Sequence, residues 1–137
     1  MEYEYDPPEK ERRITQLRKG ILELAVMGIL YHERHYGYSL IRDLTRSGSI
    51  DLKEGTIYPI LARLNRDGLV QAEWVESIQG PPRKYYSLTN AGRHLFRDLM
   101  SEFDALVSLV KLNHSCSCDD SPANNAIPSI QKEPTHA

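Results

Sequence analysis

The chain has few of the residues that mark several large classes of protein. Its two cysteines, Cys116 and Cys118, lie one residue apart in a polar segment, which excludes a disulfide-stapled secreted domain. No apolar run approaches the roughly 20 residues that cross a bilayer, and the N-terminal stretch MEYEYDPPEKERR is too charged for a signal peptide. These absences predict a soluble, cytoplasmic protein, and 137 residues suffice for one domain with flanking segments.

Sequence motifs of catalysis are also absent. The chain contains no phosphate-cradling glycine loop, no His-Glu-x-x-His zinc motif and no nucleophile elbow. His32 and His35 lie at an expected helix end, where we expect a partly exposed polar pair. We therefore predict no enzyme activity and no cofactor or metal.

The segment from residue 113 to residue 137 leaves one metal hypothesis open. It is rich in Ser, Asn, Asp and Pro and has no apolar period, which predicts a disordered tail. His114, Cys116 and Cys118 would supply three ligands for a soft cation, so a metal or redox sensor is the functional alternative. Three ligands without a rigid scaffold favour an inert tail.

Charge is unevenly distributed along a chain whose formal net charge is −2. Residues 10–97 hold fifteen Lys and Arg against nine Asp and Glu, whereas the segments on both sides are acidic. An excess of six positive charges in the central segment favours a polyanionic partner such as DNA.

The order of the expected elements is that of a winged helix-turn-helix, in a mainly α (α+β) fold. Apolar residues at helical spacing predict helices over residues 14–32 and 38–46, and Gly37 interrupts the pattern between them. Residues 1–12, which hold two prolines among acids and tyrosines, are expected to form a flexible acidic arm. The winged domain is therefore expected over residues 13–89.

A third helix is the expected DNA-reading element. It begins between Lys53 and Thr56 and ends at the glycine stop Gly68, and Pro59 lies close enough to its start for the first turn to accept it. At about 100° per residue, its apolar side chains share one inward face. That inward face consists of Ile57, Ile60, Leu61 and Leu64.

The opposite face of this helix carries small residues and cations, with polar residues on its flanks. Its members are Gly55, Thr56, Tyr58, Pro59, Ala62, Arg63, Asn65 and Arg66. If this face meets a duplex, Arg63 and Arg66 can reach guanine edges or phosphate. Thr56 and Tyr58 can donate hydrogen bonds to phosphate oxygens. The alternative is an ordinary surface helix with two arginines.

A hairpin follows, with strands expected near residues 69–77 and 84–88. Its tip, GPPRK, joins a stiff turn to the adjacent cations Arg83 and Lys84. A stiff loop loses little entropy when it docks, so these cations suit the sugar-phosphate backbone or the minor groove. A solvated turn, in which glycine and proline are expected anyway, is the plain alternative.

The last helix, expected over residues 90–112, is predicted to hold a dimer together. Thr89 or Asn90 can cap its start. Apolar side chains then recur at spacings of three and four residues, which is the pattern of a helix–helix seam. The seam consists of Phe96, Leu99, Phe103, Leu106 and Val110. We therefore predict a homodimer with this helix as the dimerisation helix.

The run from Leu17 to Phe103 resembles the PadR family of bacterial transcriptional regulators. The resemblance lies in the segments ILELAVMGIL, HYGYSLIRDL, LKEGTIYPILARLNRDGLV and GPPRKYYSLTNAGR. It implies a homodimeric winged-helix repressor that binds double-stranded DNA at an inverted-repeat operator, with the C-terminal helix in the dimer contact. It also implies release from DNA by a small-molecule effector or a stress signal.

By position, the resemblance assigns DNA contacts to residues of the helix-turn-helix and the wing: Tyr38, Thr56, Tyr58, Arg63, Arg83 and Lys84. A single helix after the wing places the chain with the shorter-tailed members. Members with an aromatic drug pocket use a tryptophan in the dimerisation helix, whereas the only tryptophan here, Trp74, lies on an expected wing strand. A multidrug site is therefore not expected.

A different function class is a winged-helix module that docks on a protein partner and does not bind DNA. Such a module should expose apolar or aromatic anchors on its docking helix. The small residues along the third helix and the cations at the hairpin tip favour DNA instead.

Overall fold

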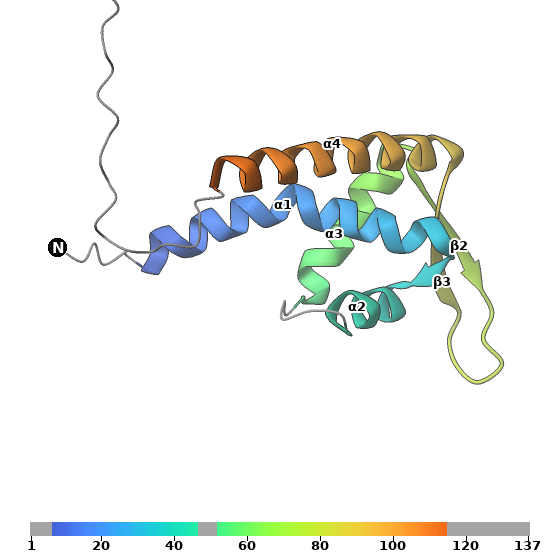
Figure 1. Ribbon diagram of the computed structural model, residues 1–137. Coiled ribbons are helices and arrows are strands. Elements are labelled where there is room, and N and C mark those ends of the chain that lie inside the picture. The colour runs from blue at the N-terminus through green and yellow to red at the C-terminus, as the bar shows by residue number, and fades with distance from the viewer. Residues whose placement is uncertain (1–6, 47–51, 115–137) are drawn as a thin grey trace, which may run out of the picture. The chain divides into compact units, whose positions relative to one another are not determined.

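The computed structural model describes residues 7–46 and 52–114 (Figure 1). Its elements are α1 Pro7–His32, β1 His35–Tyr36, α2 Gly37–Arg46, α3 Glu54–Arg66, β2 Val70–Val75, β3 Arg83–Leu88 and α4 Asn90–His114. The chain divides into two compact units, residues 1–104 and 105–137, and residues 105–114 are the described part of the second. Within the described ranges, no helix is long and apolar enough to cross a membrane. The order of elements confirms the winged helix-turn-helix fold.

The first helix starts earlier than its apolar pattern predicts. α1 begins at Pro7, seven residues before Ile14, so residues 7–12 are helical where the sequence predicts a flexible arm. Proline suits the start of a helix because its φ is already helical and its missing N–H has no intrahelical partner there. Glu9 also pairs with Arg12 and with Arg13, whose Nε lies 2.7 Å from Oε1, and pairs at these spacings stabilise a helix. The expected arm residues 1–6 lie outside the described residues.

The strand β1 is an element that the sequence analysis misses. It pairs antiparallel with β3, with Tyr36 opposite Tyr85, and β3 also pairs with β2, so the strand order is β1-β3-β2. Two residues are too few to display the alternation that identifies a strand. The predicted hairpin is confirmed; its strands and turn, residues 70–88, are called the wing below.

The start of α3 differs from the expectation in one respect. The helix follows Lys53, and Pro59 is its sixth residue, so the proline lies in the second turn and removes one intrahelical hydrogen bond. The predicted stop is confirmed: Gly68 has φ +73° and the N–H of Leu69 donates to the Leu64 carbonyl at 2.9 Å. Glycine adopts this left-handed conformation without steric cost.

The residue that precedes α4 is hydrogen-bonded to the end of α3. The hydroxyl of Thr89 accepts a hydrogen bond from the Gly92 N–H at 3.1 Å and donates to the Gly68 carbonyl at 2.7 Å. A Cβ at Gly92 would overlap the Leu69 carbonyl, so only glycine permits this approach. The predicted cap is therefore confirmed, and it also orients the wing, which lies between the two helices in the chain.

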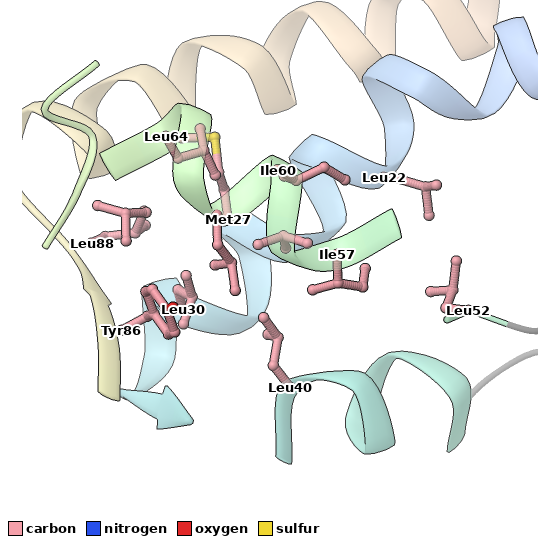
Figure 2. Close-up of a cluster of buried hydrophobic side chains, with 13 residues drawn as sticks. Leu22, Met27, Leu30, Leu40, Leu52, Ile57, Ile60, Leu64, Tyr86 and Leu88 are labelled. Atoms are coloured by element: carbon pink, nitrogen blue, oxygen red, sulfur yellow. The ribbon is translucent and has the colours of Figure 1, made fainter. Parts of the chain in front are cut away.

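The hydrophobic core combines α1, α2, α3 and the base of the wing (Figure 2). Its buried members are Leu22, Val26, Met27, Leu30, Leu40, Leu52, Ile57, Ile60, Leu61, Leu64, Val70, Tyr86 and Leu88. All four predicted inward residues of α3 are among them, which confirms the facing of this helix. Burying such a side chain contributes about 1.5–3 kcal/mol, so the opposite face of α3 is held outward.

The beginning of α4 packs within the first unit. Phe96 and Leu99 lie against the core, and the ring centroid of Phe96 is 5.1 Å from that of Tyr31. These two members of the predicted seam are half-buried within the chain. In the second unit, Leu106 and Val110 are exposed.

Candidate nucleic-acid interface

The outward face of α3 is exposed along its length. Its exposed residues are Gly55, Thr56, Tyr58, Pro59, Ala62, Arg63, Asn65 and Arg66. Gly55, Pro59 and Ala62 form a ridge of small residues at its centre, where a duplex backbone or groove wall can approach closely. The predicted division of α3 into an inward and an outward side therefore holds for every residue assigned to it.

The cations of α3 lie beside carboxylates. The Nη2 atom of Arg63 forms an ion pair with Oε2 of Glu23 on α1, and Nε of Arg66 lies 3.5 Å from Oδ1 of Asp67. Arg63 therefore reaches toward α1 from the flank of the outward face. To contact a base edge or a phosphate, it must give up or share the Glu23 carboxylate.

Tyr58 lies across the start of α2. A Cβ at Gly37 would overlap the Tyr58 hydroxyl and ring carbons, so a larger residue there would require the Tyr58 side chain to move. Burial raises the pKa of Tyr86 above its usual value, and the neighbouring Tyr58 adds to the rise. Tyr38 is the second residue of α2 and is exposed. Tyr58 therefore lies against the first residue of α2, and the exposed Tyr38 is the next residue of that helix.

The two wing cations point in opposite directions. Arg83 and Lys84 are consecutive in β3, so their side chains leave the sheet on opposite faces. The Cζ atom of Arg83 lies 4.6 Å from the ring centroid of Tyr36, whereas Nζ of Lys84 lies 5.9 Å from the ring centroid of Trp74. Arg83 and Lys84, the two adjacent cations predicted from the sequence, therefore lie near different aromatic rings.

A buried histidine supports the turn and was missed from the sequence. His35 is 7% exposed, not half-exposed as its polar neighbours suggest. Its Nδ1 lies 3.2 Å from the Ser39 hydroxyl, which donates to the Tyr36 carbonyl at 2.9 Å. Because the hydroxyl gives its proton to the carbonyl, the ring N–H donates to Ser39. His35 thereby fixes the junction of β1 and α2, and Ser39, four residues later, is one local signal for it.

The question of a metal site rests on residues at the end of the chain. Among residues 7–46 and 52–114, no group of three His, Cys, Asp or Glu side chains is placed to hold a metal ion. His114 is the last described residue, and Cys116 and Cys118 lie outside the described residues.

The sequence profile of the transcriptional regulator PadR-like family matches residues 26–98, which is more than half of the chain. The chain belongs to the PadR family. A PadR-like transcription factor from Bacteroides fragilis is 40% identical, over 74% of this chain and 98% of that one, with a TM-score of 0.64. PadR-like regulators from Bacillus cereus and Eggerthella lenta are 30% and 32% identical, over 74% and 80% of this chain and 99% and 96% of theirs, each with a TM-score of 0.68.

Membership in the PadR family gives the exposed side of the winged domain its general role. This PadR-like chain is a DNA-binding transcriptional regulator and not an enzyme. In helix-turn-helix proteins, the second helix of the motif lies in the major groove and the first crosses the backbone.

Proposed function

We propose that this PadR-like chain is a homodimeric repressor that binds an inverted-repeat operator and is released by a small-molecule or stress signal. The observation that carries the proposal is the exposed, small-residue face of α3 beside a wing whose arginine Arg83 lies on an aromatic ring. In a two-fold dimer, the two α3 helices would enter successive major grooves about 34–36 Å apart.

The proposed contacts follow from the position of each side chain. Thr56, Tyr58 and Tyr38 donate hydrogen bonds to phosphate oxygens at the edges of the groove. Arg66, at the centre of the outward face, reaches base edges, and Arg63 does so once it leaves Glu23. Arg83 and Lys84 contact the sugar-phosphate backbone or the minor groove on the two faces of the wing.

Exposed apolar side chains support the homodimer. Leu17 and Ile21 on α1 are 69% and 42% exposed. In the last part of α4, Leu106, Leu109 and Val110 are at least half exposed. Burying such side chains against a second copy contributes about 1.5–3 kcal/mol each. Phe103, another member of the predicted seam, is half-buried within the chain.

The wing gives a specific argument for the rival, a module that docks on a protein. Trp74 is 67% exposed and Ile78 is fully exposed, and exposed aromatic and aliphatic residues are typical anchors. On α3, by contrast, Tyr58 is the one aromatic residue of the outward face. We therefore favour DNA as the partner of α3.

The decisive experiment is a DNA titration at several salt concentrations, with promoter fragments from upstream of the chain's own gene. If a dimer neutralises about 6–10 phosphates, the logarithm of the binding constant should fall with log[salt] at a slope of roughly −5 to −9. Sedimentation should report a dimer at the same concentrations. Absence of binding at low salt to promoter and random DNA alike would overturn the proposal.

Repression and release need a second experiment in cells. A reporter gene under the bound promoter should be expressed more strongly when the regulator is deleted. The inducing signal should lower the occupancy of the operator by the purified chain. A reporter that loses expression on deletion would identify an activator instead.

A further inference from the structure

Aromatic rings and arginine side chains gather on the face of the sheet that carries Arg83. This cluster, the tyrosine ladder, consists of Arg34, Tyr36, Tyr38, Arg83 and Tyr85. Tyr36 is its central member, because its ring centroid lies 5.6 Å from that of Tyr85 and 6.4 Å from that of Tyr38. The ring planes of Tyr36 and Tyr38 are nearly parallel, at 18°.

Strand pairing brings the members of the tyrosine ladder together from distant parts of the chain. β1 pairs with β3, so Tyr36 is opposite Tyr85, and Arg83 lies two residues along β3 on the same face. Tyr38 follows Tyr36 by two residues, at the start of α2. Tyr36 therefore connects a residue of the wing to a residue of the helix-turn-helix.

The two arginines of the tyrosine ladder differ in how their charge is balanced. Arg34 lies 5.0 Å from the ring centroid of Tyr85, but its Nη1 is also 3.7 Å from a carboxylate oxygen of Glu73. Arg83 has the ring of Tyr36 as its partner, and it forms no ion pair within the part of the chain that the structure describes. A ring face attracts a guanidinium without using its N–H groups, which stay available for phosphate oxygens.

We propose that Tyr36 is a positioning residue for DNA binding: it holds Arg83 in place without neutralising it and aligns it with Tyr38. The wing and the start of α2 then present one continuous phosphate-binding strip. The inference rests on the proposed DNA-binding function and deepens it, because Tyr36 has no assigned role there. Pre-ordering the side chain of Arg83 lowers the entropy that is lost when it binds a phosphate.

The stacking itself can be tested without DNA. The ring of Tyr36 should shift the NMR signals of the Arg83 δ protons, because protons over an aromatic face experience its ring current. The shift should persist in Tyr36→Phe and disappear in Tyr36→Leu. Unchanged Arg83 signals in Tyr36→Leu would overturn the proposal, whatever the chain does with DNA.

The effect on binding is tested with the same variants on operator DNA. Tyr36→Leu should weaken binding about 2- to 5-fold per half-site, and thus about 4- to 25-fold on an operator with two half-sites. The salt slope should stay the same, because no charge is lost. Tyr36→Phe, which keeps the ring, should restore the affinity.

A double variant separates positioning from general loosening of the fold. In the Arg83→Ala background, Tyr36→Leu should cause no further loss, because the side chain that it positions is already gone. A further loss equal to that of Tyr36→Leu alone would mean that Tyr36 acts through the fold or by its own contact, and would overturn the proposal.

Tyr31→Leu is the matched control. Tyr31 also contacts an arginine through its ring, since Cζ of Arg93 lies 5.0 Å from the Tyr31 ring centroid. Tyr31 packs against Phe96 in the first turns of α4. Figure 1 shows these turns on the side of α1 away from α2. Its replacement should leave operator affinity unchanged. If the parent chain binds no DNA, the proposed function fails, while the ring-current comparison still decides whether Tyr36 holds Arg83.

Discussion

Helix α3 and the wing hold their arginines by different means. On α3, Arg63 forms an ion pair with the Glu23 carboxylate of α1. On the wing, Arg83 lies over the ring of Tyr36. The two side chains carry the same charge, but one is paired with an anion and the other with an aromatic surface.

From this difference we infer that α3 and the wing contribute differently to DNA binding. A carboxylate neutralises the charge of its arginine. Arg63 therefore contacts DNA only where that contact is stronger than its ion pair with Glu23, and a hydrogen bond to a matching base meets this condition best. A ring leaves the charge of Arg83 in place, so it attracts any phosphate. We therefore expect the wing to supply affinity for all DNA, and α3 to supply selectivity.

The largest expected effect is the loss of operator affinity when the dimer is lost. A dimer binds both half-sites at once, so the contributions of α3 and of the wing each count twice. Replacing both Leu106 and Val110 by Glu puts charges on exposed apolar positions and should give a monomer. Operator affinity should fall by about 10²- to 10⁴-fold, because the two sites no longer bind together. Sedimentation and DNA titration measure the two effects.

The matched control adds the same two charges elsewhere on α4. Ser101 and Ser108 are exposed and seven residues apart, outside the seam. Replacing both by Glu should leave a dimer that binds its operator. If the Leu106 and Val110 variant also remains dimeric, the C-terminal part of α4 does not hold the dimer.

Removing the wing arginine should have the next largest effect. Arg83→Ala should weaken operator and random DNA equally and should flatten the salt slope by roughly two in a dimer, one for each wing. Lys84→Ala should change binding less, because its side chain lies on the other face, near Trp74 and Tyr86. A loss confined to the operator would reverse the roles assigned to the wing and α3.

A smaller change should follow when Arg63 is released from its carboxylate. Glu23→Gln keeps the shape of the side chain but removes the charge, so Arg63 becomes available to phosphates. Random DNA should bind more tightly, with a salt slope steeper by up to about two in a dimer. The selectivity for the operator should fall, and the stability of the fold should fall by at most about 1 kcal/mol, as for other exposed ion pairs.

Glu102→Gln is the control for this prediction, because it removes one charge from an exposed position of α4. Equal salt slopes for the two variants would mean that Arg63 does not contact DNA even when the charge of Glu23 is removed. Arg63→Ala completes the comparison: a loss of about 1–3 kcal/mol on the operator alone identifies a base contact. Equal losses on operator and random DNA would identify a phosphate contact.

The general arrangement was predictable from the sequence because its signals are local. Ile57, Ile60, Leu61 and Leu64 recur at helical spacing, and this alone orients α3 in the core. The stop at Gly68 likewise depends on one residue and its conformation. The end of α3 was therefore predicted correctly, whereas the start of α1 was placed seven residues too late.

The partners of the charged residues could not be predicted, because they are distant in the chain. Glu23 and Arg63 are 40 residues apart, and no periodicity relates them. The contact of Arg83 with Tyr36 requires β1, a strand of two residues that leaves no pattern. The sequence therefore predicts which residues reach the surface, while the fold determines how each charge is balanced.

The smallest expected effect is the pH dependence of stability that is due to Tyr86, a wing residue that lies near α3. Its ring lies 5.7 Å from Nζ of Lys84 on the wing, and it is close enough to Tyr58 of α3 for that residue to influence its pKa. Burial raises the pKa of Tyr86 above its usual value of about 10, and Tyr58 adds to the rise. The phenol is therefore harder to ionise in the folded chain than in the unfolded chain.

The sign of the resulting pH dependence follows directly. Below about pH 9, Tyr86 is almost wholly neutral in both states and contributes almost nothing to the pH dependence of stability. Above that pH, the unfolded chain loses the proton first, so the free energy of unfolding should fall as pH rises. Tyr86→Phe keeps the ring but cannot ionise, and should lose less stability than the parent between about pH 9 and 11 in urea titrations. At neutral pH its operator affinity should match that of the parent, because the ring beneath Lys84 remains. If parent and variant lose stability in parallel above pH of about 10, Tyr86 is ionised as easily in the folded chain as in the unfolded one, and the contact between the wing and α3 is more open to water than its burial indicates.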